Sequence, residues 1–217
     1  LSNLERIGNK AFYQAGISGT LEIPDSVTEI GVSAFEGCKK LTYLVFKQRS
    51  EELTIGSLAF SSSGLISIYN LPSASIGDHA FANCLSLNEV YIVGGTLGTG
   101  IFQGCTNTEI TINIQGRCKI GESAFEGLVT TKEFTLSISA TYRNSIEIGN
   151  RAFYGSSIQF EEEKNGITNK GITFTNAVSY IRREAFSHCQ NINGYLTLNG
   201  AKVGDGSFSY SSFAGKL

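Results

Sequence analysis

Hydrophobic positions recur along the chain at regular intervals, and each recurrence has the same order of residues. An aliphatic residue and a glycine are followed, after two variable positions, by alanine and phenylalanine. Copies of this phrase begin at Ile7, Ile30, Ile55, Ile76, Leu97, Ile120, Ile148, Ile181 and Val203. Successive starts are 21 to 33 residues apart, and a fixed period of this size predicts a solenoid of stacked coils.

Two short alternating stretches accompany each phrase. The longer one begins about nine residues after the phenylalanine, for example at residues 21–23, 44–46, 90–92, 134–136 and 172–174. Period-two alternation of β-branched and aromatic residues predicts half-buried strands, and Pro24 and Pro72 should end two of them. The shorter stretch precedes the glycine, at residues 27–30, 53–55 and 146–148, and predicts a second, weaker ladder. The polar or small residues after Ala-Phe favour a turn or one turn of helix.

Stacking explains the pattern, because one coil cannot bury its apolar side alone whereas stacked neighbours bury it continuously. The repeated phenylalanines are therefore expected to form an internal column. The glycine suits a corner that needs a positive φ or a close backbone approach. We expect a mainly β repeat solenoid of about nine coils, with short helical or 3-10 turns and a parallel β-ladder on one face. It should form one unit over residues 1–217 and be a fragment of a larger surface or secreted protein.

Residues 21–41 carry the repeat in its fullest form, with Leu21-Glu22-Ile23-Pro24, Val27, Ile30-Gly31, Ala34-Phe35, Cys38 and Leu41. This pattern resembles the BspA-like leucine-rich repeats, also called the Treponema pallidum type, and the resemblance covers essentially the whole chain. It departs where Arg182 replaces the glycine and Ser207 the alanine. The resemblance implies a right-handed superhelix in an extracellular or surface-attached protein of bacteria or parasitic protists, and a role in adhesion.

Composition excludes several classes. The net charge is −2 and no basic stretch indicates nucleic-acid binding. No apolar run reaches the roughly 18 residues that span a bilayer. We expect no signal peptide, and because the sequence starts at Leu1 with no methionine anywhere, we expect a mature protein or an excised fragment.

Cysteines and histidines offer little chemistry in this pattern. Four cysteines each lie three residues after the repeated phenylalanine, at Cys38, Cys84, Cys105 and Cys189, while Cys118 lies elsewhere. Zinc spacing is absent, and only Cys84 and Cys105 lie on adjacent coils, where a disulfide is conceivable. The favoured interpretation is a column of small buried side chains. His79 and His188 flank Ala-Phe and build no triad, and no cofactor or metal site is predicted.

The outward strand positions are the candidate binding surface, because alternate residues of a strand point away from the core. The expected outward row is Glu22, Val45, Asn70, Tyr91, Thr111, Thr135, Thr173 and Thr197. We expect Tyr43, Lys47, Glu89 and Tyr91 to lie near one another on coils two to four. Exposed tyrosines are common binding anchors. The candidate ligand-binding residues are Tyr43, Val45, Lys47, Glu89, Tyr91, Thr111 and Thr135. The alternative is that threonine and tyrosine simply favour strands.

Three connections are lengthened, at residues 47–52, 139–145 and 161–170. Loops on rigid scaffolds often carry function, but they also tolerate sequence drift. They are therefore a second candidate surface.

The favoured function is a non-catalytic protein-binding or adhesion module, monomeric, of a cell-surface or secreted protein. Its expected partners are host extracellular matrix or other surface proteins, with glycans as a further class. A structural spacer in a larger surface protein is the alternative. A polysaccharide-cleaving β-solenoid enzyme is a third and less favoured hypothesis, because only Asp25, Asp78 and Asp205 are aspartates and paired catalytic carboxylates would have to converge across coils.

Overall fold

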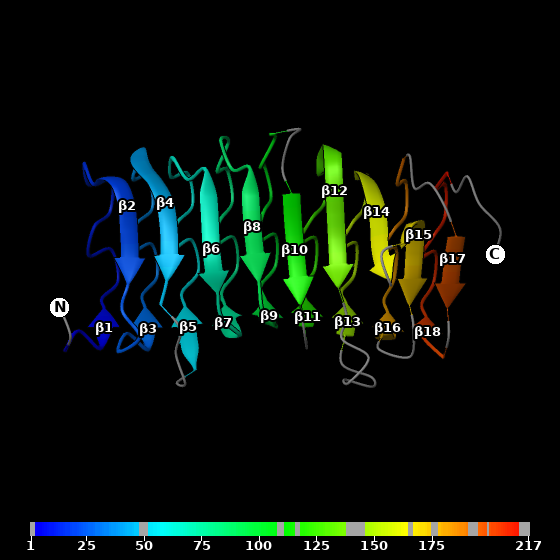
Figure 1. Ribbon diagram of the computed structural model, residues 1–217, viewed down its shortest axis with the longest axis horizontal. Helices are drawn as coiled ribbons and strands as arrows, with labels where there is room; N and C mark the ends of the chain where they lie inside the picture. Colours follow the sequence, from blue (N-terminus) through cyan, green and yellow to red (C-terminus); the bar gives the residue numbers. More distant parts are fainter. Residues whose placement is uncertain are drawn as a thin grey trace.

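Two nine-stranded sheets run along the long axis of the molecule (Figure 1). The computed structural model describes residues 3–47, 52–107, 111–115, 118–137, 146–164, 167–174, 178–190, 195–198 and 200–212. The chain alternates between the two sheets, except that the consecutive strands β14 (Ser157–Lys164) and β15 (Ile167–Phe174) lie in the same sheet. The ends of the described chain lie at opposite ends of the stack (Figure 1).

The long-strand sheet contains β2 (Ser18–Ile23), β4 (Lys40–Phe46), β6 (Ser67–Leu71), β8 (Glu89–Ile92), β10 (Thr111–Gln115), β12 (Val129–Ser137), β14 (Ser157–Lys164), β15 (Ile167–Phe174) and β17 (Tyr195–Leu198). The short-strand sheet contains β1 (Arg6–Ile7), β3 (Glu29–Ile30), β5 (Leu53–Ile55), β7 (Ala74–Ile76), β9 (Gly95–Leu97), β11 (Cys118–Ile120), β13 (Ile146–Ile148), β16 (Val178–Ile181) and β18 (Lys202–Val203). Neighbouring strands are parallel throughout, except β14 and β15.

The predicted solenoid and its strands are confirmed. Each of the five longer stretches lies within a strand of the long-strand sheet, and β2 and β6 end immediately before Pro24 and Pro72. The predicted second ladder is confirmed, and it forms a nine-stranded parallel sheet of its own. Its strands are short because the chain needs only the residues before each glycine to join neighbouring coils.

The insertion at residues 161–170 forms a β-hairpin within one coil. Glu161 pairs with Lys170 and Lys164 with Ile167, in the only antiparallel pairing between described strands. Beyond Gly171 the strand β15 pairs in parallel with β17. The long-strand sheet therefore continues past the insertion, because the chain leaves the sheet and returns to it at neighbouring positions.

The segments around Ala-Phe are turns, and the expected helical or 3-10 turn does not occur in the described residues. In the fourth coil His79 and Asn83 both have a φ of 57°. The backbone N–H groups of His79, Phe81 and Asn83 donate to carbonyls of the next coil over 2.8 to 3.1 Å. A helix would direct these N–H groups along its own axis, whereas the alternating backbone directs them between coils.

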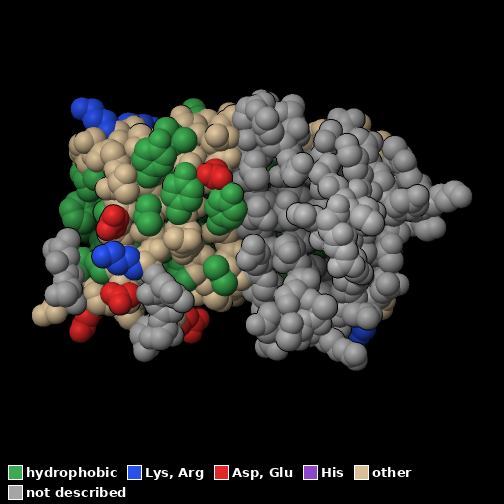
Figure 2. Space-filling model, viewed as in Figure 1, with side chains coloured by type: hydrophobic (Ala, Val, Ile, Leu, Met, Phe, Trp, Pro, Cys, Tyr) green, Lys and Arg blue, Asp and Glu red, His purple; other side chains and the backbone are tan. Residues whose placement is uncertain are grey.

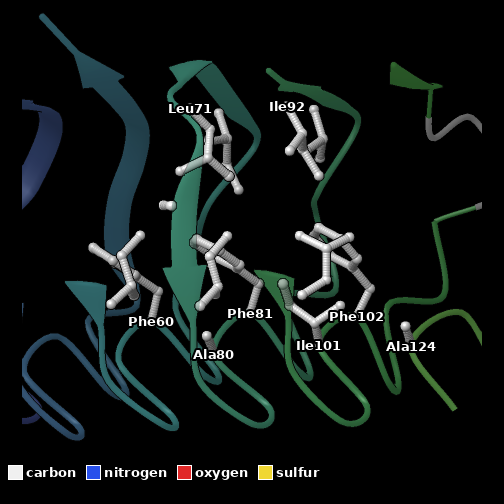
Figure 3. Packing of buried hydrophobic residues seen from close by; sticks show 14 of the residues in the cluster. Phe60, Leu71, Ala80, Phe81, Ile92, Ile101, Phe102 and Ala124 are labelled. Carbon is white, nitrogen blue, oxygen red and sulfur yellow. The ribbon is translucent and has the colours of Figure 1, made fainter. Parts of the chain in front are cut away.

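The repeated phenylalanines form the expected internal column, part of which appears in Figure 3. Adjacent ring centroids are 4.8 to 5.8 Å apart, and adjacent ring planes differ by 2° to 19°. The members are Phe12, Phe35, Phe60, Phe81, Phe102, Phe125, Phe153, Phe186 and Phe208. Phe12 at the start of the column is 41% exposed, whereas Phe35 is buried by coils on both sides. Burial of each ring thus depends on its neighbours.

The repeated glycine is required for close approach and not for a positive φ. A Cβ at Gly77 would lie 2.5 Å from the backbone nitrogen of Ser57 in the preceding coil, and Gly77 is absent from the residues with positive φ. At Gly8, the glycine of the first repeat, an added Cβ would meet nothing within 4 Å. The positive-φ alternative for this position was therefore wrong, because the left-handed residues lie nearer to Ala-Phe.

The two departures from the repeat are accommodated by polar contacts. Arg182, in place of glycine, directs its guanidinium to the carboxylate of Glu147 at 3.4 Å. Ser207, in place of alanine, is buried and its hydroxyl donates to the carbonyls of Arg182 and Gly204 at 2.9 and 2.6 Å. A buried hydroxyl needs such acceptors, so serine fits where alanine usually stands.

Gly77→Ala is expected to lower the free energy of unfolding by about 1–3 kcal/mol, the usual result of forcing a methyl group into a packed site. Urea unfolding followed by circular dichroism measures this change. Gly16→Ala is the control, since its Cβ would meet nothing within 4 Å. Equal unfolding midpoints for the two variants would contradict the close-approach explanation.

Candidate functional site

Exposed aromatic and aliphatic side chains gather on the outer face of the long-strand sheet. Figure 2 shows hydrophobic side chains on this face over the region of β4, β6 and β8, with charged side chains among them. We call the group of Tyr43, Val45, Tyr69, Tyr91 and Val93 the tyrosine patch. Tyr43, Tyr91 and Val93 are 38%, 37% and 52% exposed, and Val45 and Tyr69 are half-buried.

Strand register arranges the patch in two rows. Val45 pairs with Tyr69. The pairing of β6 and β8 shifts at this point, so that both Tyr69 and Asn70 lie opposite Tyr91. The second row runs from Tyr43 through Ser67 to Glu89. Parallel strands lie about 4.8 Å apart, so one row holds Val45, Tyr69 and Tyr91 on three successive coils.

A β-bulge in β6 sets the position of Tyr69. Asn70 has a φ of 56°, and two residues of β6 face one residue of β8 between the pairs Ile68 with Val90 and Leu71 with Ile92. A bulge of this kind inserts one extra residue and redirects side chains. Asparagine tolerates the left-handed conformation better than most residues, which explains its presence at this point.

Two polar contacts border the tyrosine patch. The Tyr91 hydroxyl donates a hydrogen bond of 2.8 Å to Oε1 of Glu89. This hydrogen bond, with smaller contributions from burial and from the negative charge of Glu89, raises the pKa of Tyr91 above its usual value. At the other end, Lys47 Nζ lies 4.0 Å from Oε2 of Glu22, with both side chains exposed. An exposed pair of this kind adds little stability.

The structure changes the predicted outward row at two positions. Tyr69 joins it, because Tyr69 pairs with Val45 and the bulge leaves both Tyr69 and the exposed Asn70 opposite Tyr91. Thr111 pairs with Glu89, and it is Asn113 that pairs with Tyr91. Thr135 pairs with Asn113, as the row requires, and Thr173 pairs with Thr197. Thr111, Thr135, Thr173 and Thr197 lie in described strands, but their side chains are outside the described part of the molecule.

The predicted cluster of Tyr43, Lys47, Glu89 and Tyr91 is looser than expected. Tyr43 on β4 is separated from Glu89 on β8 by Ser67 of β6, and Lys47 lies beyond the end of β4, beside Glu22. Tyr69 and Val93 were missed. The aromatic character of Tyr69 within a predicted strand could have indicated it, but the bulge hid its direction. Of the insertions, residues 48–51 and 139–145 lie outside the described residues.

The five cysteines are free and buried, and the column interpretation is confirmed for four of them. The thiols of Cys38, Cys84, Cys105 and Cys189 donate to the carbonyl of the repeated phenylalanine in the preceding coil, over 2.9 to 3.3 Å. Ser211 makes the same contact with the carbonyl of Phe186. The position after the turn therefore favours a small side chain with a hydrogen to donate.

Burial keeps these thiols protonated. Desolvation raises the pKa of Cys84 and that of Cys189 from 9.0 to about 11, although a hydrogen bond from a neighbouring serine opposes the rise in each. It raises the pKa of Cys118 to about 12. Because the thiolate is the nucleophile, this environment suits packing and not reactivity.

The histidines lie on the turns. His79 Nε2 is 3.1 Å from Oε1 of Gln103, and the ring of His188 lies 4.9 Å from those of Tyr154 and Tyr210. Among the described residues, no group of three or more metal-ligating side chains converges, and no helix could cross a membrane.

Comparison with known proteins identifies the repeat. The sequence matches the model of the BspA type leucine rich repeat region in six copies, over residues 1–109, 95–168 and 160–214. These ranges cover nearly the whole chain, although the six matched copies are fewer than the nine repeated phrases. No curated protein matches the sequence.

Two crystal structures match this chain. One is a leucine rich cell surface protein from Faecalibacterium prausnitzii, with 21% identity and a TM-score of 0.47, covering 94% of this chain and 62% of that chain. The other is a leucine-rich repeat protein from Bacteroides ovatus, with 20% identity and a TM-score of 0.43, covering 97% of this chain and 63% of that chain. The chain thus spans less than two thirds of either protein.

The stability of the fold should fall as the pH rises from about 9 to 11. Below about pH 9 the thiols of Cys84 and Cys189 are protonated in both the folded and the unfolded chain. Above it the thiols of the unfolded chain ionise first, so the free energy of unfolding falls until the pH passes the folded pKa of about 11. Cys84→Ser keeps a donor, as Ser211 does, but cannot ionise. Denaturant titrations from pH 8 to 11 should therefore show a smaller loss of unfolding free energy in this variant. Identical pH profiles would refute the assignment for Cys84.

Proposed function

Since the chain belongs to the BspA type leucine-rich repeat family, we propose that it is a non-catalytic binding module that recognises other proteins through its long-strand sheet. The observation that carries the proposal is the tyrosine patch. Three tyrosines and two valines lie together on the outer face of three successive coils. Tyrosine is enriched among the residues that dominate binding energy at protein interfaces.

The scaffold beneath the patch favours recognition. Residues that alternate with the patch, such as Leu44, Ile68 and Val90, are completely buried. Their packing fixes the backbone of β4, β6 and β8, so little conformational entropy remains to be lost when a partner binds. Tyrosine itself has few rotatable bonds and offers contact area at low entropic cost. A rigid surface with aromatic anchors suits a protein partner.

The setting we propose is the cell surface or the extracellular space, where the module would adhere to host matrix proteins or to surface proteins of other cells, with glycans as a second class of ligand. Catalysis is not part of this proposal. The carboxylates bordering the patch, Glu22 and Glu89, contact Lys47 and the Tyr91 hydroxyl of the same chain.

A spacer function is the second candidate. The continuous column of stacked phenylalanines and the two parallel sheets would make a stiff rod suited to holding another domain at a distance. A spacer needs no exposed aromatic patch, so the two functions differ in what happens when the tyrosines are removed.

Binding of the purified chain to a panel of matrix proteins, cell-surface proteins and glycans tests the proposal. For any protein bound, the Tyr69→Ala, Tyr91→Ala double variant should weaken affinity at least about 30-fold, because truncating an anchor residue typically costs about 2 kcal/mol or more. Biolayer interferometry provides the measurement.

Tyr13→Ala is the matched control, because Tyr13 is 43% exposed and lies on a turn away from the strands. Its affinity should equal that of the unchanged chain. Binding that survives the double variant would place recognition elsewhere, and the absence of binding across the panel would favour the spacer.

A further inference from the structure

The exposed tyrosines of the chain differ in whether a cation of the chain lies over the ring. Lys10 Nζ is 5.7 Å from the ring centroid of Tyr13, and the Arg151 guanidinium is 4.1 Å from that of Tyr154. Tyr180 has two cations, with Arg182 at 5.4 Å and Lys202 at 5.2 Å. These distances are typical of cation–π attraction.

The tyrosines of the patch have no such partner. Within the described part of the chain, no lysine or arginine lies over the ring of Tyr43, Tyr69 or Tyr91. The nearby lysines lie at the limits of β4: Lys40 is its first residue, and Lys47 follows its last and is 4.0 Å from Glu22. The electron-rich ring faces of the patch therefore remain available to a cation from outside.

Glu89 provides a negative charge beside these rings. Its Oε1 accepts the hydrogen bond from Tyr91, and no lysine or arginine of the described residues lies within ion-pairing distance of it. Four other glutamates of the described chain do form ion pairs with an arginine, namely Glu29, Glu126, Glu147 and Glu184. The side chain of Glu89 is half-buried, and a carboxylate can accept several hydrogen bonds.

We propose that the tyrosine patch selects partner proteins that present an arginine, whose guanidinium stacks on the rings of Tyr69 and Tyr91 while it donates to the carboxylate of Glu89. Arginine fits better than lysine, because its planar guanidinium stacks on aromatic faces and can donate two parallel hydrogen bonds to one carboxylate. The inference rests on the proposed function of the long-strand sheet and specifies the chemistry of its partner.

Two fluorescein-labelled peptides test this selectivity. One alternates arginine with threonine, and the other carries the neutral isostere citrulline in place of each arginine. Fluorescence anisotropy with the whole chain should show binding of the arginine peptide that is at least tenfold tighter than that of the citrulline peptide. Glu89→Gln should weaken the arginine peptide about tenfold, the loss expected for one charge-assisted hydrogen bond.

Glu147→Gln is the matched control, because it removes the same charge from the short-strand sheet, where Glu147 is paired with Arg182. It should leave the affinity for the arginine peptide unchanged. An equal loss in both glutamine variants would overturn the proposal, since the attraction would then come from net charge alone. Circular dichroism and melting of each variant verify that the fold is intact.

The outcomes also separate this inference from the proposed function. If the citrulline peptide binds as tightly as the arginine peptide, and the Tyr69→Ala, Tyr91→Ala variant loses both, the strand face binds polypeptides without selecting arginine, and only the present inference fails. If neither peptide binds, only the present inference fails, because the protein panel tests the strand face separately. If binding of the arginine peptide survives the tyrosine substitutions, the inference and the proposed strand-face binding surface fail together.

Discussion

The close approach of neighbouring coils is the constraint on which the rest of this structure depends. A Cβ added at Gly77 would lie 2.5 Å from the backbone of the preceding coil, and one added at Gly31 would lie 2.6 Å from it. Only at this separation do the phenylalanine rings stack with centroids about 5 Å apart, as Phe35 and Phe60 do at 5.1 Å. The same spacing allows backbone hydrogen bonds between coils in both sheets and in the turns. Packing density in the core and hydrogen bonding are thus satisfied by one repeat distance.

The repeat distance also decides where variation is permitted. Core positions must keep the size of phenylalanine, alanine or a small thiol, since each is enclosed by the coils before and after it. Outward strand positions face no coil and are free to carry Tyr43, Tyr69 and Tyr91. An insertion as long as residues 161–170 is accommodated as a hairpin whose ends pair with each other. Function can therefore be placed on the outer face without disturbing the stack.

The surface that results has two kinds of aromatic side chain. Tyr154 and Tyr180 are covered by arginine or lysine of their own chain, and the contact of Lys202 with Tyr180 joins two neighbouring coils. The tyrosine patch has no such covering cation and lies beside Glu89, a carboxylate without a basic partner among the described residues. The contrast within one molecule is the physical basis of our proposal that the long-strand sheet recognises partners.

Much of the fold could be predicted from the order of residues, because stacking imposes the same requirement on every coil. The Ile-Gly and Ala-Phe positions determined the coil boundaries, the phenylalanine column, the cysteine column and the location of most strands.

The candidate site was only partly predictable. Tyr43, Val45 and Tyr91 were placed correctly on the outer face, whereas Tyr69 was missed because a single left-handed residue, Asn70, adds a bulge that no periodicity reveals. Only the tertiary structure decided which tyrosines and glutamates are paired across coils, since contacts such as that of Glu126 with Arg151 join residues 25 positions apart. Sequence determines the period; register and side-chain direction, which depend on backbone conformation at individual positions, determine what the surface presents.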